Sequence, residues 1–439
     1  MKYASKLRVV ALASIATCAA VLPIGTAAAA VSRVYELLFK RLGDMTPSYA
    51  LGANTLTPLI PMLYAQLDVV SRELIGLIPS VTRDATVARA AKGQSVTSPV
   101  APVVTATDIV PGVTAPNDGD QVIGNMQMTI TKSRMVPIRW NGEEQLALAT
   151  GTGYRGILAD QFTQAFRALA NEMENDLFVQ AYRNASRAYG TPGTAPFGIA
   201  NDLSDFAAMA QILDDNGVPL SNRHMAIGSS AMANIRGKQS VLFKANEAGT
   251  DELLRQGTIG RVEGFNLHNS AAIKMIVKGT GAAYTTSGAA LAVGATAIPL
   301  ITGTGTVNPG DVVTFAGDTN KYMVVSGVAA PGTITIGMPG LRVAIPAAAT
   351  AVTVGASYTP NIAFGGGGLV LATRLPAVPV DLNGNAKDMA DDRKTIQDPV
   401  SGIAFEISTY LQYRQIKFEV AAAWGTGSAK QEQVAILQG

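Results

Sequence analysis

The chain has 439 residues, of which 48% are hydrophobic and 15% charged, which is enough apolar material for a large core and excludes disorder for most of its length. Its 34 basic and 32 acidic side chains nearly balance, so it is not a polycation that coats nucleic acid, and any DNA contact must be weak or local. One cysteine, Cys18, and two histidines exclude a cysteine-rich zinc site, a disulfide framework and a cysteine–histidine pair in the main body.

Residues 1–30 have the pattern of a secretory signal. Basic side chains among the first eight residues precede an apolar run over residues 9–22, and alanines follow at 27–30. Three interpretations are open: export, an upstream start codon in a gene whose working start is Met45, or a genuine N-terminal arm. Pro23 breaks the apolar run, which is short for a membrane span.

An amphipathic helix is predicted over residues 57–78, with Pro58 and Pro61 near its start and Pro79 ending it. Its apolar face needs a partner surface. That face carries Leu63, Leu67, Val70, Leu74 and Ile78.

Residues 93–125 are rich in Pro, Val, Thr and Gly and carry almost no charge before Asp108. Around residues 126–130, and again around 136–140, apolar and polar side chains alternate with period two, which is typical of strands. The sequence therefore predicts a long, extended β-arm over residues 81–150.

A single long helix, the spine, is predicted over Tyr154–Tyr189. Arg183 and Arg187 favour a helix C-terminus, and Gly190 with Pro192 is a stop signal. At 1.5 Å per residue this helix would span about 50 Å. Its apolar stripe comprises Leu158, Phe162, Phe166, Leu169, Met173, Leu177 and Ala181.

The spine is preceded by Gly151, Gly153 and Gly156, which match the glycine spacing of dinucleotide-binding turns and follow the apolar segment 146–149. A nucleotide fold also needs a short helix, a second strand and an acidic residue about 20 residues further on. Here the acids at that distance, Glu172, Glu174 and Asp176, still lie in the predicted helix. We therefore interpret the glycines as a flexible hinge between β-arm and spine.

Residues 191–278 indicate a compact α+β lobe. It contains a helix over Asp202–Asp215, a strand over His224–Gly228 and, after Ser229 as the expected cap, a second helix that reaches Ile235.

Possible catalytic or metal-binding residues in this lobe lack partners in the sequence. His224 and His268 have no neighbour at metal or catalytic spacing, so we expect both to be ordinary structural residues. Ser229 and Ser230 do not form a hydrolase elbow, because Met232 stands where its last glycine would be.

From residue 279 to about 355, charged residues nearly vanish and short β-prone runs alternate with Gly and Pro turns. This pattern predicts a small all-β insertion domain that forms a barrel. The runs are 297–301, 312–316, 322–325, 333–336 and 352–354.

The last part holds a strand over Leu369–Thr373, a loop over Asp381–Lys394 and two alternating strands. The strands carry Ile403, Phe405 and Ile407, then Ile416, Phe418 and Val420. Acids in the loop suggest calcium, but its glycine and glutamate are misplaced for an EF-hand, so a solvated acidic loop is the better interpretation. The oxygen-bearing residues are Asp381, Asn383, Asn385, Asp388, Asp391 and Asp392.

In this order, the parts resemble the major capsid proteins of tailed phages with the HK-ninety-seven fold, and the inserted barrel resembles coat proteins of the phage P-twenty-two type. The similarity covers about residues 46–439. It rests also on three segments: 257–265 with Ser270, where such coats close their peripheral lobe; 309–317, the first strand pair of the barrel; and 361–364, where the axial lobe begins. Gly365–Gly368 depart from the family's polar turn, which predicts a looser turn here.

The resemblance implies an α+β HK-ninety-seven-like capsid fold with an inserted all-β barrel. The expected parts are 1–44, a signal-like or extra segment without counterpart; 45–80, N-terminal arm and helix; 81–150, extended β-arm (E-loop); 151–190, spine helix; 191–278, peripheral domain; 279–358, inserted barrel; and 359–439, axial domain with the C-terminal strands.

The implied function is the major capsid protein of a tailed phage or prophage, a non-enzymatic virion component assembled in the host cytoplasm. We expect no catalytic, cofactor or metal site. The implied partners are copies of itself in hexamers and pentamers, a scaffolding protein, a portal protein, non-specifically contacted double-stranded DNA and decoration proteins, with no membrane. Contacts between subunits are expected to be non-covalent.

An uncharged β-arm cannot bury its own apolar face and must lie across a neighbour, which also favours the subunit of a shell. Two alternatives remain: an exported surface-layer or adhesin protein, suggested by residues 1–30 and the Thr/Gly-rich β module, and a nucleotide-dependent enzyme built on the glycine turn.

Overall fold

The computed structural model describes residues 59–73, 76–100, 106, 108–109, 111, 124–149, 153–239, 260–329, 331–382, 387–399 and 401–439. The chain divides into two units, Met1–Asn54 and Thr55–Gly439, and all the described residues belong to the second. The signal-like segment 1–44 therefore lies outside them. The second unit contains helices and mixed sheets, which confirms the α+β class.

The first described helix, α3, spans Ile60–Glu73. Its predicted apolar residues Leu63, Leu67 and Val70 are buried against the spine. The prediction of one helix to residue 78 is wrong, because Leu77 and Ile78 lie in the turn before Pro79. Both are nevertheless buried in the same core.

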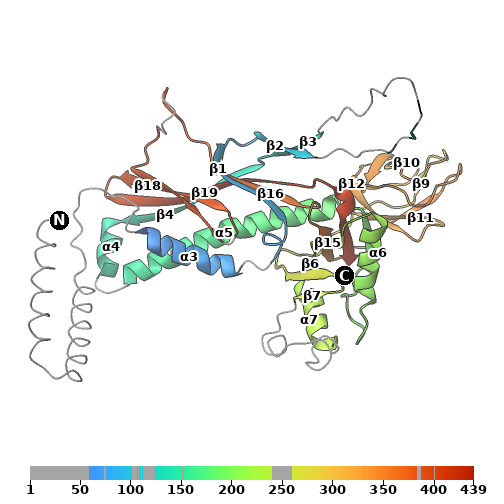
Figure 1. The fold of residues 1–439 in the computed structure, drawn as a ribbon, viewed down its shortest axis with the longest axis horizontal. Coiled ribbons are helices and arrows are strands. Elements are labelled where there is room, and N and C mark those ends of the chain that lie inside the picture. The colour runs from blue at the N-terminus through green and yellow to red at the C-terminus, as the bar shows by residue number, and fades with distance from the viewer. Residues whose placement is uncertain are drawn as a thin grey trace, which may run out of the picture. The chain divides into compact units, whose positions relative to one another are not determined.

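The spine is helix α5, which spans Gly153–Arg183 and has 31 residues (Figure 1), a length of about 46 Å. Every member of its predicted apolar stripe is buried. The prediction that it continues to Tyr189 is wrong, because β5 (Arg187–Gly190) follows it. Strand β5 pairs in parallel with β20 (Val434–Gln438) and antiparallel with β12, and these distant ladder bonds replace the local helical ones.

One face of the spine packs on a six-stranded sheet. Its order is β1 (Thr82–Ala90), β16 (Val370–Pro376), β19 (Gln415–Gly427), β18 (Ala404–Gln412) and β17 (Asp392–Gln397), and β4 (Lys132–Asn141) pairs with β19. Edge-to-face contacts join the two layers, with ring centroids 5.7 Å apart for Phe162 and Phe418 and 5.2 Å for Phe166 and Phe405. The expected loop 381–394 is thus a strand from Asp392 onward.

The expected β-arm is divided between two structures. Strands β1 and β4 belong to the six-stranded sheet, and only β2 (Ser95–Val100) and β3 (Gly124–Thr129) form a separate antiparallel hairpin. Helix α4 (Gly142–Ala149), which the sequence analysis missed, links β4 to the spine. It begins at a capping box, because Asn141 Oδ1 accepts from Glu144 N at 2.7 Å and Glu144 Oε2 accepts from Asn141 N at 3.0 Å.

The α+β lobe lies at the C-terminal end of the spine, where β5 follows α5. Beyond β5 and β20, its sheet continues through β15 (Pro360–Gly365), β6 (Arg223–Ile227), β8 (Phe265–Asn269) and β7 (Arg261–Val262), and α6 (Ser204–Asp215) and α7 (Ser229–Lys238) belong to the same lobe. A short 3-10 turn, η3 (Gln431–Gln433), precedes β20. The expected cap role of Ser229 is wrong, because Gly228 holds the N-cap position without a side-chain bond and the helix passes Ile235 to reach Lys238.

Six strands from residues 284–354 close into a ring. Their order is β11 (Val312–Phe315), β14 (Ala351–Val354), β9 (Tyr284–Thr286), β10 (Ala297–Ile301), β13 (Gly332–Ile336) and β12 (Lys321–Ser326), and β12 pairs again with β11. The five β-prone runs correspond to strands, and β9 was missed. The segments that lead into and out of the ring lie side by side, since Ile276 N donates to Tyr358 O at 2.7 Å.

Candidate assembly surfaces

The β2–β3 hairpin is the first candidate contact surface. Neither strand contains a charged residue, and within the described ranges the two strands pair only with each other. The outer edge of each strand therefore presents backbone donors and acceptors that another chain can pair with.

The base of this hairpin is fixed on the six-stranded sheet. Met128 and Ile130 are buried with Ala372 and Ala423 of that sheet. A Cβ on Gly425 would collide with the carbonyl oxygen of Thr129, so only glycine lets β3 approach β19 this closely. The base of the hairpin is thus held in a fixed position on the six-stranded sheet.

Charged side chains attach β4 to the spine. Lys132 Nζ lies 2.9 Å from Glu172 Oε1 and 2.8 Å from Asp176 Oδ1, and Trp424 Nε1 donates to Asp176 Oδ2 at 2.8 Å. Burial lowers the pKa of Lys132, but the bonds to Asp176 and Glu172 outweigh it, and the pKa is raised. The strand that leads back from the hairpin is therefore held to the rigid helix.

A buried carboxylate on the spine joins three segments. Glu174 accepts hydrogen bonds from Leu77 N at 2.5 Å, from Ile78 N at 2.9 Å and from Ser270 Oγ at 2.7 Å. Gly76 lies against the same carboxylate, where a Cβ would collide with Glu174 Oε1. The turn after α3, the spine and the end of β8 thus depend on one side chain.

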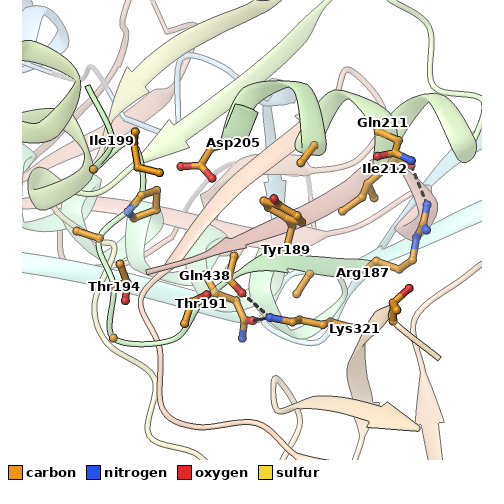
Figure 2. Close-up of a pocket in the computed structure, with 18 of the residues that line it drawn as sticks. Arg187, Tyr189, Thr191, Thr194, Ile199, Asp205, Gln211, Ile212, Lys321 and Gln438 are labelled. Atoms are coloured by element: carbon orange, nitrogen blue, oxygen red, sulfur yellow. Dashed lines mark hydrogen bonds between the residues drawn. The ribbon is translucent and has the colours of Figure 1, made fainter. Parts of the chain in front are cut away.

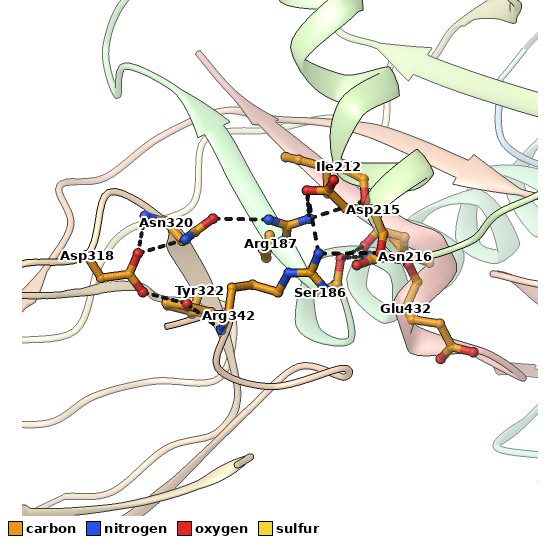
Figure 3. A network of polar contacts seen from close by, with 11 residues as sticks. Ser186, Arg187, Ile212, Asp215, Asn216, Asp318, Asn320, Tyr322, Arg342 and Glu432 are labelled. Carbon is orange, nitrogen blue, oxygen red and sulfur yellow. Dashed lines mark hydrogen bonds and ion pairs between the residues drawn. The ribbon is translucent and has the colours of Figure 1, made fainter. Parts of the chain in front are cut away.

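The ring is joined to the lobe by a polar network around Arg187 (Figure 3). Its guanidinium donates to Asn320 Oδ1 of the ring at 3.0 Å and to Asp215 Oδ2 of α6 at 2.9 Å. Tyr322 donates to Asp318 Oδ2 at 2.6 Å. Burial, reinforced by Asp318, raises the pKa of Tyr322 to about 12, so this hydroxyl stays protonated.

The ring's first and last segments are fixed by Asp311 and Tyr358. Asp311 accepts from Asn308 N at 2.7 Å and from Gly279 N at 3.1 Å, and Tyr358 donates to Gly310 O at 2.7 Å. Burial raises the pKa of Tyr358 well above its usual value. These contacts place the ring at the C-terminal end of the spine, where Gly310 lies against Tyr182.

Exposed apolar side chains gather at the far end of the six-stranded sheet. Leu411 and Tyr413 lie at the β18–β19 turn, Met389 lies in the segment before β17, and Leu146 lies on α4. Gly142 N donates to Arg414 O at 3.2 Å, which brings α4 beside the turn. Such a group of exposed apolar residues is typical of a contact surface.

The turn between β15 and β16 contradicts the looser turn expected for Gly365–Gly368. A Cβ on Gly365 would lie 2.6 Å from Val218 Cγ1, and one on Gly368 would lie 2.9 Å from Val434 Cγ2. Gly367 N also donates to Gln433 Oε1 at 3.0 Å. The turn is closely packed, and glycine is required there because a larger side chain would collide with its neighbours, not because the backbone needs to be flexible.

The two histidines, for which the sequence showed no partner at metal or catalytic spacing, lie together. His224 Nδ1 is 3.0 Å from His268 Nε2, and His224 Nε2 is 2.8 Å from Asn222 Oδ1. The parallel pairing of β6 with β8 brings them together, which their separation of 44 positions in sequence could not indicate. Burial lowers the pKa of His224.

The other candidate residues form no site in the described part of the chain. Gly153 and Gly156 lie inside α5 rather than in a hinge, and Gly151 lies outside the described residues. The apolar run 146–149 belongs to α4 and is not a strand. Asn383 and Asn385 also fall outside the described residues, and in the rest no His, Cys, Asp and Glu side chains form a group of three or more that could hold a metal ion.

The structure of the chain is similar to several solved structures. Mycobacterium phage Che8 aligns with a TM-score of 0.39 and 11% identity over 79% of this chain and 85% of that chain. A capsid structure of cyanophage P-SCSP1u aligns with a TM-score of 0.44 and 11% identity over 82% and 86%. A virus-like particle from Pyrococcus furiosus aligns with a TM-score of 0.39 and 10% identity over 86% and 98%.

No protein-family model and no curated protein matches the sequence. Among the described residues, no helix combines the length and the apolar character needed to cross a membrane.

Proposed function

We propose that this chain is the major capsid protein of a tailed double-stranded DNA phage or prophage, and that its copies form an icosahedral head around the genome. The observation that carries the proposal is the β2–β3 hairpin, an uncharged pair of strands without a third strand in the described ranges, fixed at its base to a sheet and a 31-residue helix. Such a hairpin completes its ladder on another copy, and the helix supplies a rigid strut. This role requires no catalysis.

The finer assignment is the HK-ninety-seven fold of the P-twenty-two type. The described parts of the three segments on which the resemblance rests support it. Residues 261–265 contain β7 and the start of β8, residues 312–315 form ring strand β11, and Asn361 in β15 accepts from Gly228 N at 2.8 Å. On this assignment, residues 191–278 are the peripheral domain, 279–358 the inserted barrel and 359–439 the axial domain.

The same proposal assigns the partners. Copies of the chain form hexamers and pentamers on a scaffolding protein, a portal protein occupies one vertex, and packaged DNA is contacted non-specifically. Decoration proteins are further candidates. The nearly balanced charge of the chain suits a weak DNA contact.

Electron microscopy of the expressed chain with its scaffolding protein tests this function. Closed shells of uniform size are expected. Particles should be lost, with the subunit still folded, when a short Gly-Ser linker replaces residues 98–126 and leaves the buried base of the hairpin intact. A chain that stays monomeric under all assembly conditions contradicts the proposal.

The alternative function, an exported surface-layer or adhesin protein, is favoured by the signal-like residues 1–30. Mass spectrometry of the mature N-terminus separates the two. Cleavage after the Ala27–Ala30 run favours export, whereas a start at Met45 favours the capsid protein.

A further inference from the structure

A cleft of about 1090 Å³ lies where the lobe meets the ring (Figure 2). Its walls come from β5, the segment 191–199, helix α6, the end of α7 and ring residues 319–321. Gln438 of β20 also lines it. A cleft of this volume is large enough for a small organic ligand.

Two buried nitrogen atoms beside this cleft lack a hydrogen-bond partner. Among the described residues, Arg187 Nε and Gln438 Nε2 are the only buried side-chain nitrogens of this kind, and both residues line the cleft. Arg187 is 5% exposed and Gln438 is 1% exposed. Leaving such a donor unsatisfied costs about 1–3 kcal/mol, and an unpaired buried donor commonly marks the place of a water or a bound group. Both donors call for an acceptor oxygen.

A lysine next to Gln438, Lys321, adds positive charge that no carboxylate in the described part of the chain balances. Lys321 Nζ donates to Gly190 O and to Gln438 Oε1 at 3.4 Å, and both acceptors are neutral. Burial lowers the pKa of Lys321, and no acidic neighbour opposes that shift. An ammonium group has three donors, so these two bonds leave one for an oxygen in the cleft.

The acids that line the cleft, Asp205 and Asp215, already have hydrogen-bond or ion-pair partners. Asp215 is bound by Arg187, and its Oδ2 lies 3.8 Å from Arg342. Asp205 accepts from Phe197 N at 2.7 Å and lies across the cleft from Lys321 (Figure 2). Tyr189, which is partly exposed, lies between these two ends. The cleft therefore has a cationic end beside an aromatic surface.

We propose that this cleft binds an organic oxyanion, a carboxylate or phosphate whose oxygens meet Lys321 and Gln438 and whose apolar body lies on Tyr189 and Ile199. The charged hydrogen bond from Lys321 supplies most of the affinity, because charge-assisted bonds are the strong ones. Binding needs one chain only and is independent of the proposed shell, so its failure leaves the shell proposal untouched.

Isothermal titration calorimetry on the full, unassembled chain tests this site. The probes are phenyl phosphate, phenylacetate and inorganic phosphate, and comparing the first two shows which oxyanion is preferred. Saturable binding with one ligand per chain is expected for at least one aromatic probe, more tightly than for inorganic phosphate. Lys321→Met should weaken it at least about tenfold. The matched control Lys274→Met changes an exposed lysine outside the cleft and should leave affinity unchanged.

A second variant keeps the test decisive if Lys321→Met does not fold. Ile199 is exposed, so Ile199→Glu should fold normally, and its added negative charge should weaken binding of either aromatic anion. The site is refuted if no probe binds saturably, or if the folded variants retain wild-type affinity. Equal affinity for phenyl phosphate and inorganic phosphate would refute the apolar part of the proposal.

Discussion

Glu174 lies on the buried side of the spine, where a carboxylate is unusual, and its three donors come from segments almost 100 residues away. Glu174→Ala leaves two buried backbone N–H groups and the Ser270 hydroxyl without their acceptor. We expect the free energy of unfolding to fall by about 3 kcal/mol. Urea denaturation of the unassembled chain measures it.

Asp160→Ala is the matched control, because Asp160 is an exposed acid on the same helix. Its effect should stay within about 0.5 kcal/mol. Equal losses in the two variants would show that Glu174 does not join the three segments.

His224 makes stability depend on pH. Because its folded pKa is lowered by burial, the unfolded chain binds more protons as pH falls through the unfolded value of about 6.5. Stability should therefore decrease from pH 7.5 to 5.5 and level off below the folded pKa. Unfolding free energies measured across this range should show a shallower slope in His224→Gln, and an unchanged slope would contradict the assignment.

Gly156 distinguishes a helix from a hinge. It lies inside α5, and a Cβ there meets nothing within 4 Å. Gly156→Ala should therefore raise the free energy of unfolding by about 0.5–1 kcal/mol, because alanine is the better helix former. Gly76→Ala should destabilise through its collision with Glu174. Calorimetric melting of both variants tests the pair, and a loss of stability in Gly156→Ala would favour the hinge.

Among the helices and strands, hydrophobic periodicity identified those that depend on the local sequence alone. The spine's stripe from Leu158 to Ala181 was correct at every position, because one face of an isolated helix already displays it. Strand β5 was mistaken for helix, because residues 187–190 become a strand only through β20, which lies about 250 residues later. Helix α4 was missed because it has only eight residues and because its short apolar segment resembles a strand.

The β2–β3 hairpin is expected to be needed for assembly but not for folding of the subunit. Replacing residues 98–126 by a short Gly-Ser linker removes the part of the hairpin that pairs only with itself and leaves the buried Met128 in place, so the melting temperature should change by no more than a few degrees. Assembly should nevertheless fail, because the unpaired strand edges are gone. Light scattering after mixing with the scaffolding protein measures shell formation. Normal shell formation by the variant would show that the hairpin is not needed for assembly.

At the scale of the whole molecule, the contacts that join distant segments were not predictable from the sequence. The closing of the ring by β11 and β12, and the pairing of β1 with β16 across almost 290 residues, follow from contacts that no local pattern contains. The same holds for Gly365–Gly368, whose glycines indicated looseness by themselves but are required by Val218 and Val434. Sequence alone identified the long periodic elements, and tertiary packing determined the short ones and how the elements join.

On the proposed function, copies of this chain build a closed container. Cryo-electron microscopy of residues 45–439 co-expressed with the scaffolding protein tests it most directly. We expect icosahedral shells in which the β2–β3 hairpin of each subunit lies across a neighbouring copy. A solitary subunit with its hairpin folded back onto its own chain would contradict the account.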